Sequence, residues 1–322
     1  MPGDVGRFNC VVLLGPTAVG KTAIGVRLAH EFGGCIISAD SRQTYRKLDI
    51  GSGKDLGEYQ VDGIPVGYRL IDVADLTEEY SLFSYQRDFY RAFAELEAEG
   101  ILPVVVGGTG MYLDSVIRGY SLPDVPDNPE LRADLESRSL DELARIFLEL
   151  KPDPHNRSDL LDRSRTIKAI EIALAARDGD RRPAPRRPDI RPLVIGTTLD
   201  RPVLWDNIAR RLRERLDGGM LEEVSGIHRS GIPWERLERL GLEYRYCSLY
   251  LEGKIPSMED LYDRLFIAIR QFAKRQETWF RGMERKGVPV RWLPRVPGKE
   301  ERIAAAENMM AECGFRMSGV GC

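Results

Sequence analysis

The chain has 322 residues, enough for about two domains of ordinary size. Hydrophobic residues make up 43% of it, charged residues 30% and aromatic residues 8%, values unlike those of disordered or collagen-like chains. The net charge of −3 excludes a general attraction to polyanions but allows a local basic surface. No apolar run approaches the roughly 18 to 20 residues that cross a membrane, so we expect no membrane partner.

Cysteine and histidine are sparse and scattered. The five cysteines include no Cys-x-x-Cys pair, and the three histidines are not at metal-ligand spacing. This pattern predicts reduced thiols, a cytoplasmic location and no structural zinc site.

In the first third of the chain, short β-branched runs alternate with helical stretches, which is typical of βαβ units around a parallel sheet. The expected strands span residues 10–14, 35–38, 68–71 and 102–106. The expected helices span residues 20–32, 81–98 and 110–118.

A proline-rich turn at residues 120–128 breaks this alternation. No convincing strand follows until residue 193, and helices are expected at 129–137, 139–150 and 162–176. The segment 181–192, with four prolines and five arginines, reads as an extended connector. We therefore expect a core formed by residues 1–122 plus 192–322 and an all-helical insert at 123–191.

After a returning strand at 193–198, the remainder is expected to be helical, at residues 202–216, 220–229, 240–251 and 257–283. Seven basic residues against two acidic ones lie between Arg264 and Lys286, and six arginines against three aspartates lie between Arg177 and Arg191. A nucleic-acid partner would bind at these stretches.

The segment Gly15-Pro16-Thr17-Ala18-Val19-Gly20-Lys21-Thr22 fits G-x-x-x-x-G-K-[ST] between an apolar strand and an amphipathic helix. In such a loop, backbone N–H groups and the helix N-terminus surround phosphate oxygens. Lys21 neutralises a terminal phosphate and the Thr22 hydroxyl can hold Mg²⁺. The sequence thus predicts a P-loop NTPase-like α/β fold, with a parallel sheet flanked by helices, that binds a phosphate compound of undetermined kind.

Other candidate residues follow the remaining strands. Asp40 comes after the second strand, where a carboxylate can accept a proton, bind Mg²⁺ or cap a turn. The glycines before Thr109 indicate either a close backbone approach to a ligand or a tight turn. Asp72 ends an apolar run, as a metal-binding acid or a solvated strand end would.

Together these segments resemble the tRNA dimethylallyltransferase family, also called tRNA isopentenyltransferases, over most of the chain. The similar segments include the phosphate loop, Ile37-Ser38-Ala39-Asp40-Ser41, Leu70-Ile71-Asp72, Val106-Gly107-Gly108-Thr109-Gly110-Met111-Tyr112 and Leu221-Glu222-Glu223-Val224. The most specific is Ala273-Lys274-Arg275-Gln276-Glu277-Thr278-Trp279-Phe280-Arg281, which matches the family's A-K-R-Q-x-T-W-F-R signature.

The resemblance implies transfer of a dimethylallyl group from dimethylallyl diphosphate to N6 of the adenosine next to the anticodon of tRNA (position 37), with Mg²⁺ as cofactor. By similarity the phosphate loop holds the prenyl diphosphate, and Lys21 and Thr22 with Mg²⁺ draw charge from the leaving pyrophosphate. Asp40 matches the family's general base, Thr109 a position at the mouth of the reaction channel, and Arg211 a basic position aimed at the pyrophosphate.

The same resemblance implies binding of the anticodon stem-loop by a protein that we expect to be a monomer. The implied tRNA contacts are Asp40, Ser41, Arg42, Gln43, Thr109, Arg132, Arg165, Lys168, Lys274, Arg275 and Arg281. Arg132, Arg165 and Lys168 belong to the insert at 123–191, so the resemblance implies tRNA binding by this insert. The chain departs from the family pattern at several positions: Lys168 replaces an arginine, Glu243 a glycine, and Ser52, Gly53 and Asp55 the usual threonine, alanine and proline. These changes leave the implied chemistry untouched and bear on which RNA is accepted.

Three alternatives remain open at this point. A phosphate-loop kinase would use Asp40 as base and Asp72 on Mg²⁺, but would not need the signature at 273–281. An isopentenyltransferase acting on free adenine nucleotides would not need the basic C-terminal helix. An RNA-binding protein without catalysis would not need Lys21, Thr22, Asp40 and Thr109 intact.

Overall fold

A computed structural model describes residues 8–122, 125, 128–152, 160, 163–178 and 186–318. The chain divides into two compact units, one formed by Met1–Gly119 and Arg187–Cys322 and the other by Tyr120–Arg186. Most of the expected loop at 151–158 and residues 181–185 of the expected connector lie outside the described residues.

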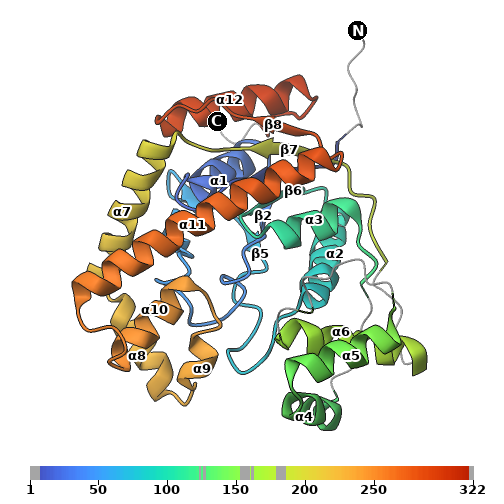
Figure 1. The fold of residues 1–322 in the computed structure, drawn as a ribbon. Helices are drawn as coiled ribbons and strands as arrows, with labels where there is room; N and C mark the ends of the chain where they lie inside the picture. The colour runs from blue at the N-terminus through green and yellow to red at the C-terminus, as the bar shows by residue number, and fades with distance from the viewer. Residues whose placement is uncertain are drawn as a thin grey trace. The chain divides into compact units, whose positions relative to one another are not determined.

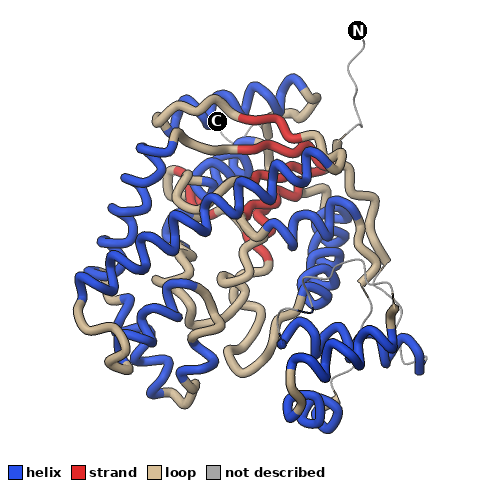
Figure 2. Tube along the Cα trace, in the orientation of Figure 1, coloured by secondary structure: helices blue, strands red, loops and turns tan. Residues whose placement is uncertain are grey.

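The first unit is built on a six-stranded sheet with the strand order β5-β2-β6-β1-β7-β8 (Figures 1 and 2). Every pairing in this sheet is parallel. This arrangement confirms the predicted α/β fold class. The strands are β1 (Cys10–Leu14), β2 (Gly34–Ser38), β5 (Tyr68–Arg69), β6 (Leu102–Gly107), β7 (Pro192–Gly196) and β8 (Val290–Trp292).

Both faces of the sheet are covered by helices, which is why its four inner strands, β2, β6, β1 and β7, are buried and almost entirely apolar. Cys10, Val12 and Leu14 of β1 pack against α2 (Leu82–Ala98), α3 (Gly110–Arg118) and the C-terminal part of α11 (Met258–Arg285). Val11 and Leu13 face α1 (Lys21–Glu31) and α12 (Lys299–Glu312). The alternation of side chains along β1 therefore fills two separate cores.

A third apolar cluster lies beyond the sheet. It joins α7 (Arg201–Asp217), α8 (Met220–Arg229), α9 (Trp234–Leu237), α10 (Leu242–Leu251) and the N-terminal part of α11. Tyr45 and Leu48, from the segment after β2, are buried in this cluster. The long helix α11 thus takes part in two cores and crosses the unit (Figure 1).

The second unit contains α4 (Pro129–Ser137), α5 (Leu140–Leu150) and α6 (Arg163–Asp178) around a small core. Local sequence explains these helices well. Asn128 caps α4, and Ser139 forms a capping box with Glu142 at the start of α5. Leu143 and Phe147 of α5 pack against Ile167 and Ile170 of α6.

The expectation of helices alone after residue 198 is wrong, because β8 adds a sixth strand at the sheet edge. With three residues, β8 is too short to show an alternating pattern, and its pairing to β7 defines it. The sequence also did not predict α9, α12, the 3₁₀ turn η1 (Leu56–Glu58) or the hairpin of β3 (Gln60–Val61) and β4 (Ile64–Pro65).

Strand β5 ends two residues earlier than expected. Leu70 and Asp72 have positive φ angles of 62° and 56°, which turn the chain out of the sheet after Arg69. Among the described residues, no helix is both long and apolar enough to span a bilayer.

Candidate active site

The phosphate loop joins β1 to α1 at the carboxyl edge of the sheet. Ala18 and Gly20 have positive φ angles of 62° and 81°, so the loop turns sharply before α1 begins at Lys21. Gly15 is required by a close approach, because a Cβ there would lie 2.2 Å from the carbonyl oxygen of Thr197. The loop is therefore wedged against the chain that follows β7.

Three side chains from distant helices hold the loop. Gln276 of α11 accepts a hydrogen bond from the Thr17 amide (2.9 Å) and donates one to the Gly108 carbonyl (2.9 Å). Arg302 of α12 donates from Nη1 to the carbonyl of Val19 (2.5 Å). Asn207 of α7 donates from Nδ2 to the carbonyl of Ala18 (3.2 Å).

The sequence did not single out these three residues for a role. One signal for Gln276 was available, because it lies between Ala273 and Phe280 on the buried face of α11. A buried amide in an apolar repeat needs hydrogen-bond partners. Here they are the phosphate loop and the turn after β6.

Lys21, the first residue of α1, directs its side chain back to the loop. Its Nζ donates a hydrogen bond to the carbonyl of Pro16 (2.6 Å). Burial lowers the pKa of Lys21 to about 8, an effect that the Asp40 charge opposes and the Arg211 charge reinforces. A cation that is poorly solvated in this way favours the approach of an anion.

The pKa of Lys21 leads to a prediction on pH. Because the free ammonium loses its proton as pH rises through about 8, the contribution of Lys21 to diphosphate affinity should be complete below that pH. The affinity should weaken by up to roughly tenfold per pH unit above it. Calorimetric titration with inorganic pyrophosphate from pH 6.5 to 9.5 measures this. The matched variant Lys21→Arg stays charged throughout and should lack the break near pH 8; a break in both proteins would assign it to another group.

Asp40 follows β2 and lines the same pocket as Lys21. Because β2 and β6 are neighbours, their following turns meet, and the Thr109 amide donates to the Ala39 carbonyl (3.1 Å). The Ser41 amide donates to the Thr109 hydroxyl (3.0 Å). Asp40 Oδ1 accepts the Arg42 amide (2.9 Å), and within the described residues Oδ2 makes no hydrogen bond. Thr109 thus fixes the turn that presents the Asp40 carboxylate.

A second turn, at residues 49–53, forms another wall of the site. The Glu223 carboxylate accepts hydrogen bonds from the amides of Asp49, Ile50 and Gly51 at 3.2, 2.6 and 3.2 Å, and from the Tyr244 hydroxyl at 2.7 Å. This contact gives the Leu221-Glu222-Glu223-Val224 segment a positioning role that the sequence did not reveal.

Gln43 ties this wall to the sheet. Its Oε1 accepts from Ser38 Oγ (3.0 Å), and its Nε2 donates to the carbonyl of Gly53 (3.1 Å). Both ends of the Gln43 side-chain amide are therefore already hydrogen-bonded, and Gln43 supports the turn at residues 49–53.

Arg211 of α7 completes the polar lining. Its Nη2 lies 3.7 Å from Asp55 Oδ2, and Arg215, one turn further along α7, lies 3.8 Å from Glu243 Oε1. Burial and the neighbouring Arg215 lower the pKa of Arg211 to about 10, so it remains charged at neutral pH. Asp55 and Glu243, the two acidic departures from the family pattern, thus flank one pair of arginines.

These groups line one central pocket with a volume of about 890 Å³. Gly15 and Pro16 support the phosphate loop without lining the pocket. The predicted site residues that the pocket brings together are Thr17, Ala18, Val19, Gly20, Lys21, Thr22, Asp40, Ser41, Arg42, Gln43, Thr109, Arg211 and Arg275.

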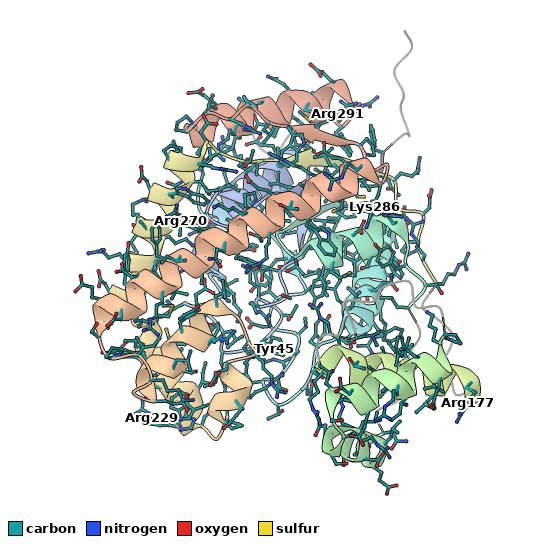
Figure 3. All side chains as sticks on the ribbon, viewed as in Figure 1. Tyr45, Arg177, Arg229, Arg270, Lys286 and Arg291 are labelled. Atoms are coloured by element: carbon teal, nitrogen blue, oxygen red, sulfur yellow. The ribbon has the colours of Figure 1, made fainter. Side chains whose placement is uncertain are left out.

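The basic stretch at residues 264–286, most of it on α11, lies beside this pocket; Arg270 within the stretch and Lys286 at its end are labelled in Figure 3. Arg275 lines both the central pocket and a second groove of about 520 Å³, which also includes Lys274. Arg281 is exposed on the same helix but lines neither cavity. The predicted RNA-binding side chains of α11 are therefore all exposed, and two of them border hollows.

The other predicted tRNA contacts belong to the second unit. Arg132 Nε and Lys168 Nζ both bind the buried carboxylate of Glu171, at 3.0 and 3.2 Å. Arg165 is exposed on α6. Asp162, which precedes α6, lies outside the described residues.

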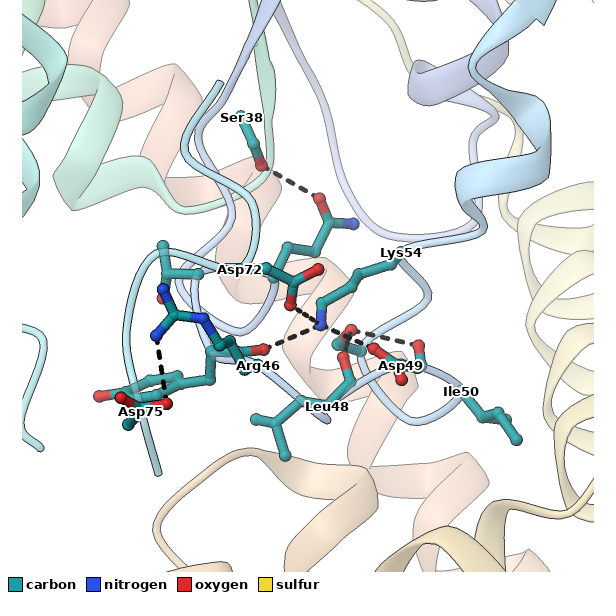
Figure 4. A network of polar contacts seen from close by, with 12 residues as sticks. Ser38, Arg46, Leu48, Asp49, Ile50, Lys54, Asp72 and Asp75 are labelled. Carbon is teal, nitrogen blue, oxygen red and sulfur yellow. Dashed lines mark hydrogen bonds and ion pairs between the residues drawn. The ribbon is translucent and has the colours of Figure 1, made fainter. Parts of the chain in front are cut away.

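Asp72 does not line the central pocket. It pairs with Lys54, whose buried ammonium also donates to the Tyr45 carbonyl (2.8 Å) and to Asp49 Oδ1 (2.7 Å), as Figure 4 shows. This arrangement does not favour the alternative of Asp72 as a metal ligand next to the phosphate loop. Its carboxylate instead helps to close the turn at residues 45–54.

Comparisons with known proteins agree along the chain. A family model described as IPP transferase matches residues 43–283, and one described as Isopentenyl transferase matches residues 8–63. The tRNA dimethylallyltransferase 2 of Trichlorobacter lovleyi is 50% identical over 303 residues, which cover 94% of this chain and 96% of the relative. The tRNA dimethylallyltransferase 1 of Syntrophus aciditrophicus is 49% identical, covering 88% and 93%.

Solved structures give the same result. The full-length tRNA isopentenylpyrophosphate transferase from Bacillus halodurans matches with a TM-score of 0.67 and 30% identity, over 94% of this chain and 95% of that one. A eukaryotic dimethylallyltransferase acting on tRNA, 20% identical, shares the fold with a TM-score of 0.73 over 96% and 81% of the two chains. The chain belongs to the IPP transferase family, the family of the tRNA dimethylallyltransferases.

Proposed function

We propose that this protein transfers the dimethylallyl group of dimethylallyl diphosphate to N6 of adenosine 37 in tRNA, giving N6-isopentenyladenosine and pyrophosphate. The observation that carries the proposal is a single pocket with the phosphate loop on one side and the Asp40 turn on the other. A donor diphosphate and an acceptor amine can meet there, while the basic face of α11 lies beside the pocket for RNA.

In the donor half, backbone amides of residues 18–22 and the Lys21 ammonium would bind the diphosphate. Arg211 would bind it from the facing helix. As the bond between C1 and the diphosphate oxygen breaks, the oxygen keeps the electron pair, and these fixed cations stabilise the charge that develops there.

In the acceptor half, N6 of the adenine would form the new bond to C1 and release a proton. Asp40 would accept this proton on the oxygen that faces the pocket, since Oδ1 is held by the Arg42 amide. Thr109 would keep the Asp40 turn in place through the Ser41 amide. Holding N6 against C1 supplies much of the rate gain, because it replaces an encounter by a positioned contact.

The donor set suits Mg²⁺. The Thr22 hydroxyl and the Asp40 carboxylate line one pocket, and the described residues contain no group of three or more His, Cys, Asp or Glu that would form an all-protein cage. Mg²⁺ commonly uses few protein ligands together with phosphate oxygens and water. We therefore propose Thr22 as its protein ligand; when bound, Mg²⁺ neutralises charge on the diphosphate.

For the RNA, we propose that Lys274, Arg275 and Arg281 bind phosphates of the anticodon stem-loop, and that the helical unit contributes Arg132, Arg165 and Lys168. Lys274, Arg275 and Arg281 on α11 and Arg165 on α6 are exposed, which together with their charge supports this role. Arg132 on α4 and Lys168 on α6 are half-buried and pair with Glu171, so only their charge supports it. The target adenine leaves the loop stack to enter the pocket, at a cost of roughly a few kcal/mol that binding contacts offset. Since tRNA is the acceptor, we place the reaction in the cytoplasm.

Substrate size tests the proposal. Prenylation of AMP, an anticodon stem-loop and whole tRNA is to be measured at two ionic strengths. Most RNA affinity would come from phosphate contacts. The logarithm of the association constant for the stem-loop should therefore fall linearly with the logarithm of the salt concentration, with a slope of roughly −0.7 to −0.9 per neutralised phosphate. AMP should react poorly and show little salt dependence.

Comparable kcat/KM on AMP and stem-loop would instead indicate an isopentenyltransferase for free nucleotides. Neither that alternative nor a kinase is favoured by the relatives, which are tRNA dimethylallyltransferases along nearly the whole chain. ATP-dependent phosphorylation without prenyl transfer would contradict the proposal outright.

A further inference from the structure

A row of three side chains along α7 leads away from the phosphate loop. Asn207, Arg211 and Arg215 are spaced at i, i+4 and i+8, and all three line the central pocket. Asn207 contacts the phosphate loop directly, through the Ala18 carbonyl. Arg215 lies two turns further on, about 12 Å along the helix axis. The row therefore reaches beyond the donor end of the pocket to the turn at residues 49–53.

At that turn the two guanidinium groups come together over Gly53. A Cβ on Gly53 would lie 2.1 Å from Arg211 Nη2 and 1.6 Å from Arg215 Nη2, and Gly53 has a positive φ of 64°. A side chain at position 53 would push the ends of one or both arginines away from their present places. Two like charges held side by side are unfavourable unless an anion is close to both.

The acidic neighbours do not satisfy these donors. Asp55 Oδ2 lies 3.7 Å from Arg211 Nη2 and 4.0 Å from Arg215 Nη2, both beyond hydrogen-bond distance. Arg215 Nη1 donates weakly to the Gly51 carbonyl (3.4 Å) and lies 3.8 Å from Glu243 Oε1. Within the described residues, the buried Nη2 of Arg215 has no hydrogen-bond partner.

We propose that Arg215, together with Arg211, binds a phosphate oxyanion of the substrates, and that Asp55 competes with this anion for the two guanidinium groups. The inference rests on the proposed function, which brings two phosphate-bearing substrates into this pocket. The position of Arg215 two turns from the phosphate loop favours a phosphate of the acceptor RNA beside the inserted adenosine. The donor diphosphate is the other source of the same chemistry.

Opposite charge changes at the two residues test the competition. Arg215→Gln removes the guanidinium, whereas Asp55→Asn removes the competing charge and keeps a residue type that tolerates the left-handed backbone of Asp55 (φ 44°). Arg213→Gln is the matched control, because Arg213 is on the same helix but stacks on Tyr262 and does not line the pocket. The probes are inorganic pyrophosphate and an anticodon stem-loop RNA, each titrated directly.

We expect Arg215→Gln to weaken the binding of one probe by roughly 10-fold or more and Asp55→Asn to tighten it by a few-fold. In the double variant the gain from Asp55→Asn should be smaller than in the single variant, because Asp55 then competes for Arg211 alone. If the RNA is the probe affected, its salt slope should also fall by about one, and the phosphate comes from the acceptor. If pyrophosphate is affected, the phosphate comes from the donor.

The proposal is overturned if both probes bind Arg215→Gln and Arg213→Gln equally well, or if Asp55→Asn weakens binding as Arg215→Gln does. In the second case the cluster only holds the turn at residues 49–53 in place. Arg215→Lys, which restores the charge, should recover part of the lost affinity. Transfer of the prenyl group to tRNA by the wild-type protein is assayed in parallel. If the wild type has no such activity, the proposed function is refuted. If it is active but the variants bind both probes as the wild type does, only the role of Arg215 is refuted.

Discussion

Replacement of Asp40 by asparagine is expected to lower kcat by roughly 10²-fold or more while donor and tRNA affinities stay close to wild type. Asparagine keeps the oxygen that accepts the Arg42 amide, so the turn after β2 should be preserved. It cannot accept the proton that N6 releases. Single-turnover kinetics with saturating donor and tRNA, together with binding titrations, measure both parts of this expectation.

Asp75→Asn provides the matched control for Asp40→Asn. Asp75 has the same side chain, but it pairs with Arg46 and does not line the central pocket. Its kcat should remain near wild type. A near-normal kcat for Asp40→Asn would remove Asp40 from the chemical step and leave the proton to solvent or to another group.

Replacement of Lys21 by alanine should lower donor affinity as well as turnover, because its charge would meet the diphosphate before and during the reaction. A charged hydrogen bond of this kind is worth about 1.5–3 kcal/mol, so pyrophosphate affinity should fall by roughly 10- to 100-fold. The fall in kcat/KM for the donor should be at least as large. Titration with pyrophosphate separates the binding loss from the catalytic loss.

Lys254→Ala is the control for Lys21→Ala, since Lys254 is exposed, pairs with Glu252 and is absent from the pocket lining. It should bind pyrophosphate like the wild type. Unchanged affinity in Lys21→Ala would mean that the loop binds phosphate through its backbone amides alone, and that Lys21 acts only on the transition state.

The parts that the sequence predicted are those with strong local signals. The glycines and Lys21 of the phosphate loop act within one strand–turn–helix unit, so their spacing alone identifies the loop. Helix starts at Ser81, Ser139 and Ser257 follow from side-chain caps that need only the next turn of helix. The parallel sheet follows from apolar runs that alternate with amphipathic helices.

Other features depend on residues that are far apart in the sequence. Gln276 reaches a loop 259 positions earlier, and Arg302 one 283 positions earlier. No local pattern marks such a contact, because the partner is a backbone group that any residue type could offer. The turn at residues 49–53, where Glu223 accepts hydrogen bonds from three successive amides, could not be predicted from the sequence for the same reason.

By itself, the sequence determined the fold class, the phosphate loop, the family resemblance and the acidic character of positions 55 and 243. Only the tertiary structure decided that Asp72 binds Lys54 outside the pocket, that three residues near the C-terminus form a sixth strand, and that Asp55 and Glu243 flank Arg211 and Arg215. The physical reason is the distance along the sequence between the residues that interact. Turns, caps and periodicity are set by neighbours within a few residues, whereas ion pairs, edge strands and pocket walls arise when packing of the cores brings distant segments together.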